Sequence, residues 1–172
     1  MQHSRWGLGA LLATSALLAS CGRAGGDRAL EAANPVAPLP QPPLGITAKW
    51  SDLAEPPAPE RVRLGRWLFY DKRLSADGTL SCASCHRPET AFSEPTPVST
   101  GIHGQKGKRK APSFVNEAWT LYPHFFWDGR AASLEEQALG PIANPVEMGS
   151  THDAMLATLA GIRGYAPYFQ RA

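Results

Sequence analysis

The sequence lacks any strong excess of charge of one sign. Its 172 residues include 17 Lys and Arg against 15 Asp and Glu, for a formal net charge of +2. Proteins that bind nucleic acid through their overall field carry a larger positive excess, so we expect no nucleic-acid partner. With 43% hydrophobic and 19% charged residues, the composition is that of an ordinary soluble domain, and the length allows one core but not two.

The sequence also lacks a hydrophobic run long enough to span a membrane comfortably. The apolar stretch of residues 8–18 follows Arg5 and leads into the run Leu18-Ala19-Ser20-Cys21, as is typical of an export signal. That run resembles the lipobox of bacterial lipoproteins, in which the cysteine, here Cys21, is diacylated and becomes the mature N-terminus. A generic signal peptide cleaved at another small residue is the alternative.

The lipobox resemblance implies a location. In lipoproteins a residue other than Asp after the lipidated cysteine implies the outer membrane where one exists, and here that residue is Gly22. We therefore expect residues 1–20 to be a lipoprotein-type signal peptide. The protein would be exported to the periplasm and held at the outer membrane by a lipid on Cys21.

Cysteine is scarce, with three in the whole chain. Two of them belong to the run Cys82-Ala83-Ser84-Cys85-His86, whose spacing suits covalent attachment of haem through two thioethers, with His86 as proximal iron ligand. A redox dithiol or half a zinc site is the alternative, but a dithiol needs no following histidine and the chain offers no second ligand pair. Lipid on Cys21 and haem on Cys82 and Cys85 leave no thiol for a disulfide.

The composition of residues 21–58 differs from that of the rest of the chain. Prolines recur there at positions 35, 38, 40, 42, 43, 56 and 57, and they exclude both helix and central strand. This segment is predicted to be an extended tether between the lipid and the domain. An arm packed on the domain is the alternative, which Trp50 and Leu53 favour near its end.

The globular part is predicted to span residues 59–172 and to be mostly helical, a cytochrome c-like haem domain with long loops. A Pro-Glu start and a broad apolar stripe predict a helix from Pro59 to Tyr70. A capping box at Ser133 predicts a second helix that ends near Leu139, before Gly140-Pro141. Thr151 or Asp153 could cap a third that runs to about Gly161. Frequent Gly, Pro and Ser make long strands unexpected.

Several motifs around the Cys-x-x-Cys-His run occur in a familiar order. They are Leu64-Gly65-Arg66, Leu68-Phe69-Tyr70-Asp71, Arg73-Leu74-Ser75, Ala111-Pro112-Ser113, Phe126-Trp127-Asp128-Gly129-Arg130, Gly140-Pro141 and Glu147-Met148. Residues 59–172 therefore resemble the N-terminal haem domain of the bacterial di-haem cytochrome c peroxidase family, which includes the MauG-like enzymes. The resemblance implies one covalent haem c here, hydrogen peroxide as substrate and a small redox protein as electron donor.

The resemblance also implies roles for residues around the haem. Glu147 matches the distal acid/base, since a carboxylate can take a proton from iron-bound peroxide and return it to the leaving oxygen. Gln137 matches its polar neighbour. Trp127 matches the tryptophan between the two haems, an electron conduit. His103 lies in a loop resembling the one that carries a removable sixth iron ligand, although MauG-like members keep this haem open. Met148 is expected to fill a gap in the core.

Two further positions follow from the same comparison. Arg109, which precedes Lys110 and Ala-Pro, matches an arginine expected to contact a haem propionate. Lys110 stands where the peroxidases carry an Asn that helps to hold calcium, and an ammonium group cannot ligate that ion. Calcium is therefore a doubtful cofactor, and Lys110 is hypothesised to replace its charge. Asp128 and Arg130 are expected to form a local ion pair.

The sequence holds one Cys-x-x-Cys-His motif, whereas the family design uses two haems. We therefore expect one haem per chain and weak peroxide turnover from this chain alone. A bis-His electron-transfer domain, with His86 and His103 both on iron, is one alternative to the peroxidase. The other is a MauG-like oxidase that matures a protein-derived cofactor. The oligomeric state stays open.

Overall fold

The computed structural model describes residues 29, 31–53, 56–120 and 122–172. Contacts divide the chain into two units, Met1–Pro35 and Val36–Ala172. The predicted signal peptide and Cys21 lie outside the described residues. None of the described helices is both long and apolar enough to cross a lipid bilayer.

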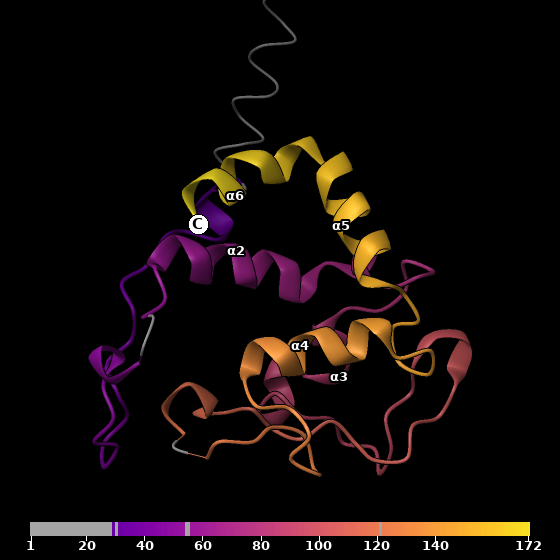
Figure 1. Ribbon diagram of the computed structural model, residues 1–172, viewed down its shortest axis with the longest axis horizontal. Coiled ribbons are helices and arrows are strands. Elements are labelled where there is room, and N and C mark those ends of the chain that lie inside the picture. The colour runs from indigo at the N-terminus through magenta and orange to yellow at the C-terminus, as the bar shows by residue number, and fades with distance from the viewer. Residues whose placement is uncertain (1–28, 30, 54–55, 121) are drawn as a thin grey trace, which may run out of the picture. The chain divides into compact units, whose positions relative to one another are not determined.

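The described chain is mostly helical, as predicted. Its α-helices are α2 (Pro59–Tyr70), α3 (Cys82–Cys85), α4 (Leu134–Ala143), α5 (His152–Gly161) and α6 (Ala166–Arg171). Short 3₁₀ helices cover Trp50–Asp52, Lys72–Leu74, Pro88–Thr90, Ile102–Gly104, Glu117–Trp119 and Arg163–Tyr165. The residues described contain isolated β-bridges but no strand. Helix α2 contacts α6 on one side and α3 on the other (Figure 1).

Two helix predictions are confirmed. Helix α2 begins with Pro59 in its first turn and ends at Tyr70, because proline is pre-shaped for a helix start and lacks the N–H that would be unpaired there. Helix α5 begins after Thr151, whose hydroxyl accepts a hydrogen bond from the Ala154 N–H at 3.1 Å. Of the two caps considered, Thr151 is therefore the one used.

The predicted end of α4 is wrong. Ser133 caps it as expected, accepting from the Glu136 N–H at 3.1 Å, but the helix continues through Pro141 to Ala143. The chain that follows turns back and donates backbone hydrogen bonds to carbonyls of this last turn, from Met148 to Pro141 and from Ser150 to Ile142. Tertiary contacts thus satisfy the helix end that local sequence alone would have left unpaired.

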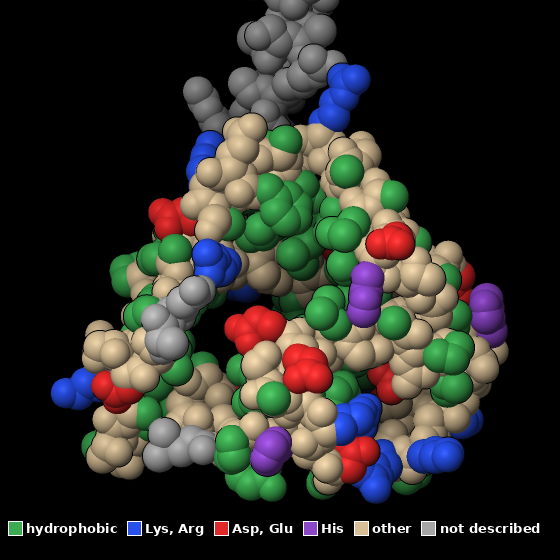
Figure 2. Space-filling model, in the orientation of Figure 1, with side chains coloured by type: hydrophobic (Ala, Val, Ile, Leu, Met, Phe, Trp, Pro, Cys, Tyr) green, Lys and Arg blue, Asp and Glu red, His purple; other side chains and the backbone are tan. Residues whose placement is uncertain are grey.

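The core lies between α2, α5 and α6. Its buried members are Leu64, Leu74, Ile142, Met148, Leu159 and Tyr165, with Trp67, Leu68, Met155 and Tyr168 packed around them. The space-filling view shows hydrophobic side chains gathered between these helices and a hollow between α2 and α4 (Figure 2). Met148 is 5% exposed within this cluster, which agrees with its predicted role as a packing residue.

The end of the proline-rich segment contacts the domain. The rings of Trp50 and Trp119 lie 4.1 Å apart between centroids, and the Trp50 indole N–H donates to the Pro40 carbonyl at 2.8 Å. Trp119 is buried. The ring of Trp50 therefore packs against Trp119 of the domain.

Asp71 ties the end of α2 to the C-terminal part of the domain. Its carboxylate accepts hydrogen bonds from the Arg73 guanidinium at 2.8 and 2.6 Å and from the Tyr165 hydroxyl at 2.8 Å. Burial acts to raise the pKa of Asp71, but the hydrogen bonds from Arg73 and Tyr165 outweigh it and lower that pKa. The same contact and burial raise the pKa of Tyr165 to about 12.

We predict that Asp71→Asn lowers the free energy of unfolding by about 2 kcal/mol, because the charge-assisted bonds to Arg73 weaken and an amide N–H₂ faces the donors. Denaturant titration above pH 6 measures this loss. The stability from Asp71 is present above 3.8, the ordinary pKa of aspartate, and is lost as the pH falls through the lowered folded value. The free energies of unfolding of wild type and variant should therefore become equal in acid. A difference that persists at low pH would contradict the role assigned to Asp71.

Candidate haem-binding site

The Cys-x-x-Cys-His run forms α3 and its C-terminal cap. The Ser81 N–H donates to the Ser84 hydroxyl at 3.0 Å, which fixes the start of the turn, and the His86 N–H donates to the Cys82 carbonyl at 2.9 Å. Residues three apart in a helical turn share a face. Cys82 and Cys85 therefore lie on one face of α3, and the His86 ring follows directly; all three side chains are half-buried.

The orientation of His86 is set by one hydrogen bond. Its Nδ1 lies 2.9 Å from the Phe92 carbonyl oxygen, which can only accept, so Nδ1 carries the proton. The lone pair is then on Nε2, the nitrogen turned away from that contact. This tautomer and this type of backbone partner are those of a histidine that ligates a metal through Nε2.

The Phe92 carbonyl is presented by a tight loop. Arg87 and Ser93 pair as an isolated antiparallel bridge, and Ala91 and Phe92 both adopt the left-handed region at φ 55°. Two consecutive non-glycine residues in that region carry an energetic cost of order 1–3 kcal/mol each and need surrounding contacts to hold them. Those contacts come from the next motif along the chain.

The Ala-Pro-Ser motif, residues 111–113, holds this loop in place through hydrogen bonds. The Ser93 hydroxyl donates to the Ala111 carbonyl at 2.6 Å, and the Ser113 hydroxyl donates to the Ala91 carbonyl at 2.6 Å. Next to it, the Phe114 ring lies 4.9 Å from the His86 ring and 4.8 Å from the Phe92 ring. Residues 111–114 therefore hold the loop and pack against the imidazole that the loop orients.

The two thiols are unsuited to dithiol chemistry. Burial raises the pKa of the Cys82 thiol. Burial, with the charges of Glu94 and Glu147 adding to it, raises the pKa of the Cys85 thiol to about 11. Redox-active cysteines need a lowered pKa. Within the described part of the chain, no group of three or more His, Cys, Asp and Glu side chains could hold a metal ion.

The surroundings fit a covalent haem. Among the described residues, no large side chain falls below 2% exposure. Native cores of this size contain fully buried side chains. Together with two thiols on one face and a free Nε2 on His86, this feature is as expected of a core that a large apolar group completes.

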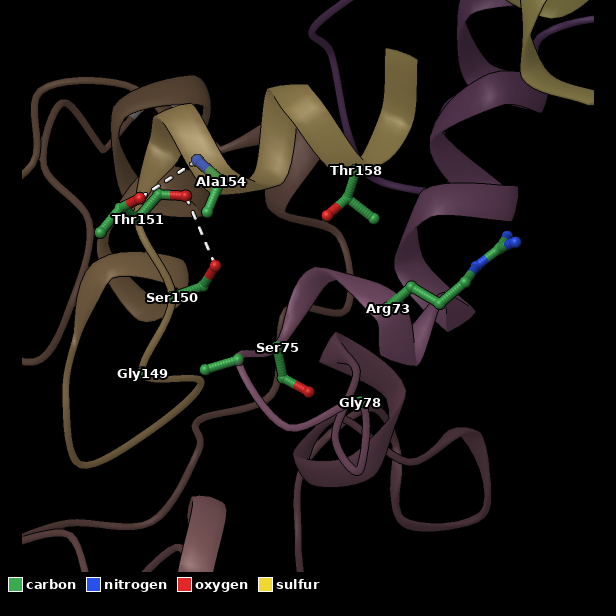
Figure 3. Close-up of a pocket in the computed structure, with 9 residues that line it drawn as sticks. Arg73, Ser75, Gly78, Gly149, Ser150, Thr151, Ala154 and Thr158 are labelled. Carbon is green, nitrogen blue, oxygen red and sulfur yellow. Dashed lines mark hydrogen bonds between the residues drawn. The ribbon is translucent and has the colours of Figure 1, made fainter. Parts of the chain in front are cut away.

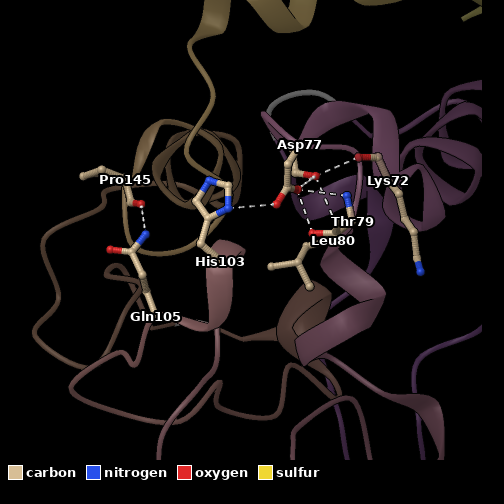
Figure 4. A network of polar contacts seen from close by, with 8 residues as sticks. Lys72, Asp77, Thr79, Leu80, His103, Gln105 and Pro145 are labelled. Atoms are coloured by element: carbon tan, nitrogen blue, oxygen red, sulfur yellow. Dashed lines mark hydrogen bonds and ion pairs between the residues drawn. The ribbon is translucent and has the colours of Figure 1, made fainter.

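His103 lies on the outside of its loop. Its backbone is left-handed at φ 54°, its side chain is 67% exposed, and its Nδ1 is 3.7 Å from the Asp77 carboxylate (Figure 4). Asp77 is itself held by the Thr79 N–H at 3.0 Å and the Thr79 hydroxyl at 2.7 Å. The prediction that His103 ligates iron stays a prediction, and this geometry places its ring against Asp77.

The loop around His103 is docked on the segment that carries Glu147. The Ile102 N–H donates to the Glu147 carbonyl at 2.9 Å, and the Gln105 amide donates to the Pro145 carbonyl at 3.0 Å. A Cβ at Gly101 would lie 1.7 Å from the Val146 carbonyl oxygen, so only glycine permits this approach. Residues 101–105 are thereby clamped on both sides of His103.

Glu147 is half-buried and oriented by a neighbour. Its Oε1 accepts a hydrogen bond from the Asn144 amide at 2.9 Å. Burial raises the pKa of Glu147, although Arg130, the Asn144 hydrogen bond and His86 act in the opposite direction. Since its charge also acts on the Cys85 thiol, Glu147 lies within electrostatic reach of the haem-attachment motif.

The remaining predicted residues are spread around this centre. Gln137 lies half-buried on α4, and no hydrogen bond of its side chain occurs within the described residues. Trp127 is 58% exposed, and its indole N–H donates to the Lys110 carbonyl at 3.0 Å. Arg109 is exposed. The structure thus brings Glu147 towards the motif, whereas Trp127 and Arg109 face outwards.

The predicted ion pair beside Trp127 is confirmed. Arg130 donates to both oxygens of Asp128 at 2.7 and 2.9 Å, and its guanidinium stacks 3.6 Å from the centre of the Phe126 ring. This turn therefore has a fixed shape around the exposed Trp127.

An open cavity of about 410 Å³ lies away from the motif (Figure 3). It is lined by Arg73, Ser75, Ala76, Gly78, Gly149, Ser150, Thr151, Ala154 and Thr158. None of these residues is a thiol, an imidazole or a predicted catalytic group. The cavity is therefore not where we place the haem.

A turn bearing two thiols, followed by a histidine with a free Nε2, defines the site of a c-type haem domain. Residues 59–172 match the sequence profile of the family described as Di-haem cytochrome c peroxidase. The chain belongs to this family of haem c oxidoreductases, which confirms the resemblance stated above.

Individual relatives agree with this assignment. The chain is 43% identical over 119 residues to the methylamine utilization protein MauG of Methylorubrum extorquens, covering 69% of this chain and 33% of that protein. It is 40% identical over 131 residues to the cytochrome c551 peroxidase of Nitrosomonas europaea, covering 76% and 36%. The chain thus spans about a third of the length of the curated relatives it matches.

Solved structures show the same fold. A MauG-like protein associated with microbial copper homeostasis superposes with a TM-score of 0.57 at 34% identity, covering 80% of this chain and 39% of that one. The diheme peroxidase BthA of Burkholderia thailandensis gives a TM-score of 0.60 at 28% identity, covering 72% and 35%. Each likeness covers less than two fifths of the solved chain.

Gly101→Ala should loosen the loop from the Glu147 segment, because the added methyl group collides with the Val146 carbonyl. We predict a loss of about 2 kcal/mol or more in the free energy of unfolding, measured by denaturant titration. Gly65→Ala is the matched control, since a Cβ at Gly65 in α2 meets nothing within 4 Å and alanine favours a helix by up to about 1 kcal/mol. Equal effects of the two substitutions would contradict the docking described.

Proposed function

We propose that Cys82 and Cys85 form thioethers with one haem and that His86 is its proximal ligand through Nε2. The observation that carries this proposal is the hydrogen bond from His86 Nδ1 to the Phe92 carbonyl at 2.9 Å, which fixes the tautomer that a proximal ligand needs. Membership of a haem c family supports it. Arg109 is the proposed partner of a propionate.

We further propose that this domain reduces hydrogen peroxide with electrons from a small redox protein. A bound haem supplies an iron centre that exchanges electrons with peroxide. Glu147 would take a proton from one oxygen of hydrogen peroxide and return it to the other, which leaves as water. Two electrons from the redox donor and two further protons from solvent would convert the remaining oxygen to a second water. The bond from Asn144 to Oε1 leaves Oε2 for this proton, and Gln137 is the polar neighbour proposed on α4.

The distal side is proposed to be open. His103 is 67% exposed beside Asp77, and its loop is clamped at Ile102 and Gln105. A bis-His electron-transfer domain would need His103 to leave Asp77 and turn inward. The clamped loop therefore favours a peroxide-accessible haem over that alternative.

A second candidate function is MauG-like oxidation of a protein substrate. The exposed side chain of Trp127 would serve this function too, because an aromatic ring at the surface can carry an electron between the domain and a partner that cannot touch the haem. In the peroxidase the same ring would receive electrons from the redox partner. We place the protein outside the cytoplasm, anchored through Cys21, in either case.

Glu147→Gln tests the peroxidase proposal. In haem-loaded protein, with haem content verified by mass, the rate at which peroxide changes the haem spectrum should fall about 10²–10⁴-fold. Because burial raises the pKa of Glu147, the wild-type rate should fall as the pH drops through a value above 4.5, the ordinary value for glutamate. The rate of the Glu147→Gln variant should not fall over this pH range.

Glu135→Gln is the matched control, since Glu135 is an exposed carboxylate on the first turn of α4. Its rate and pH profile should equal those of wild type. A Glu147→Gln protein that reacts with peroxide at the wild-type rate would refute the acid/base role.

A further inference from the structure

Glu94 is a buried carboxylate to which the proposed reaction assigns no role. It is 7% exposed, and in the described part of the chain it forms no ion pair. A buried, unpaired carboxylate is costly unless hydrogen bonds or a nearby positive charge stabilise it. Its neighbours show which of these apply.

Two neutral donors hold Glu94 in place. Its Oε1 accepts hydrogen bonds from the Ala111 N–H, at 2.9 Å, and from the Ser99 hydroxyl. Ala111 also accepts from the Ser93 hydroxyl at 2.6 Å. Glu94 therefore joins the segment that fastens the loop carrying Phe92, the partner of His86.

Glu94 also lies close enough to the attachment motif to act on it through space. It follows Phe92 by two residues, and the Phe92 carbonyl oxygen lies 2.9 Å from His86 Nδ1. Neutral hydrogen-bond donors screen the negative charge of a carboxylate less than a neighbouring cation would. The negative charge is thus held in a low-dielectric position on the loop that orients the proposed iron ligand His86.

We propose that Glu94 is a positioning residue on the proximal side whose fixed charge stabilises the ferric haem over the ferrous haem. The inference rests on the proposed attachment of haem at Cys82, Cys85 and His86. Ferric haem carries one more positive charge than ferrous haem, so a nearby buried carboxylate favours the oxidised state and lowers the reduction potential. The bonds to Ala111 and Ser99 keep that charge at a constant distance.

Glu94→Gln is the direct test, because glutamine keeps the shape and an amide oxygen that can accept from Ala111 and Ser99 while it removes the charge. In the haem-loaded full chain, the ferrous-to-ferric ratio at a fixed applied potential should rise on the order of tenfold. For a one-electron couple this is an upward shift of about 59 mV in midpoint potential. An unshifted potential in loaded Glu94→Gln protein overturns the inference.

Glu89→Gln is the matched control. Glu89 belongs to the same loop and carries the same charge, but its side chain is exposed and water screens it. Its midpoint potential should equal that of wild type. A shift as large as that of Glu94→Gln would show a general charge effect and would overturn the specific role.

Ser99→Ala provides a second test if Glu94→Gln does not take up haem. It removes one donor and leaves the charge of Glu94 less neutralised, so the midpoint potential should move downwards, opposite to Glu94→Gln. A purely structural role predicts no such reversal, and an unchanged or raised potential overturns the inference.

Covalent haem content separates the two proposals: unloaded wild type overturns both, whereas loaded wild type with unshifted variants overturns only the role of Glu94.

Discussion

The bond between His86 Nδ1 and the Phe92 carbonyl is the constraint on which the site depends. It fixes the tautomer of His86, and the loop that presents the carbonyl has Ala91 and Phe92 in left-handed backbone conformations. Such conformations are stable only where neighbouring contacts enforce them. The Ala-Pro-Ser motif supplies those contacts through Ala111 and Ser113. The Ala-Pro-Ser motif, which begins 25 residues after His86, thus helps to orient the His86 ring.

The distal side is organised by a comparable fastening of loop to loop. Gly101 and Ile102 lie against the backbone of Val146 and Glu147, so the candidate acid/base and the loop of His103 form one packed unit. The two carboxylates differ in burial. Glu147 is half-buried with Asn144 on one oxygen, whereas Glu94 is buried and held by neutral donors. Two carboxylates with different surroundings are suited to different roles.

Much of this arrangement could be predicted from the sequence. The stripe that begins at Pro59 and the cap at Thr151 gave correct helices because both signals are local. The end of α4 was misplaced, since Pro141 is accommodated by backbone bonds from Met148 and Ser150 that only the folded chain provides. The role of the Phe92 carbonyl as the hydrogen-bond partner of His86 could not be predicted, because every residue has a backbone carbonyl oxygen. Glu94 and Asn144 belong to no sequence motif. They are identified only by their burial and their hydrogen-bond partners in the folded chain.

The central claim is that the domain holds one covalent haem with His86 on one side and an accessible face towards Glu147 on the other. The most direct measurement is the electron paramagnetic resonance spectrum of the ferric, haem-loaded full chain, compared with His103→Ala. We predict a high-spin signal that peroxide alters and that His103→Ala leaves unchanged. A low-spin signal in wild type that becomes high-spin in His103→Ala would contradict the account, because it would place His103 on the iron.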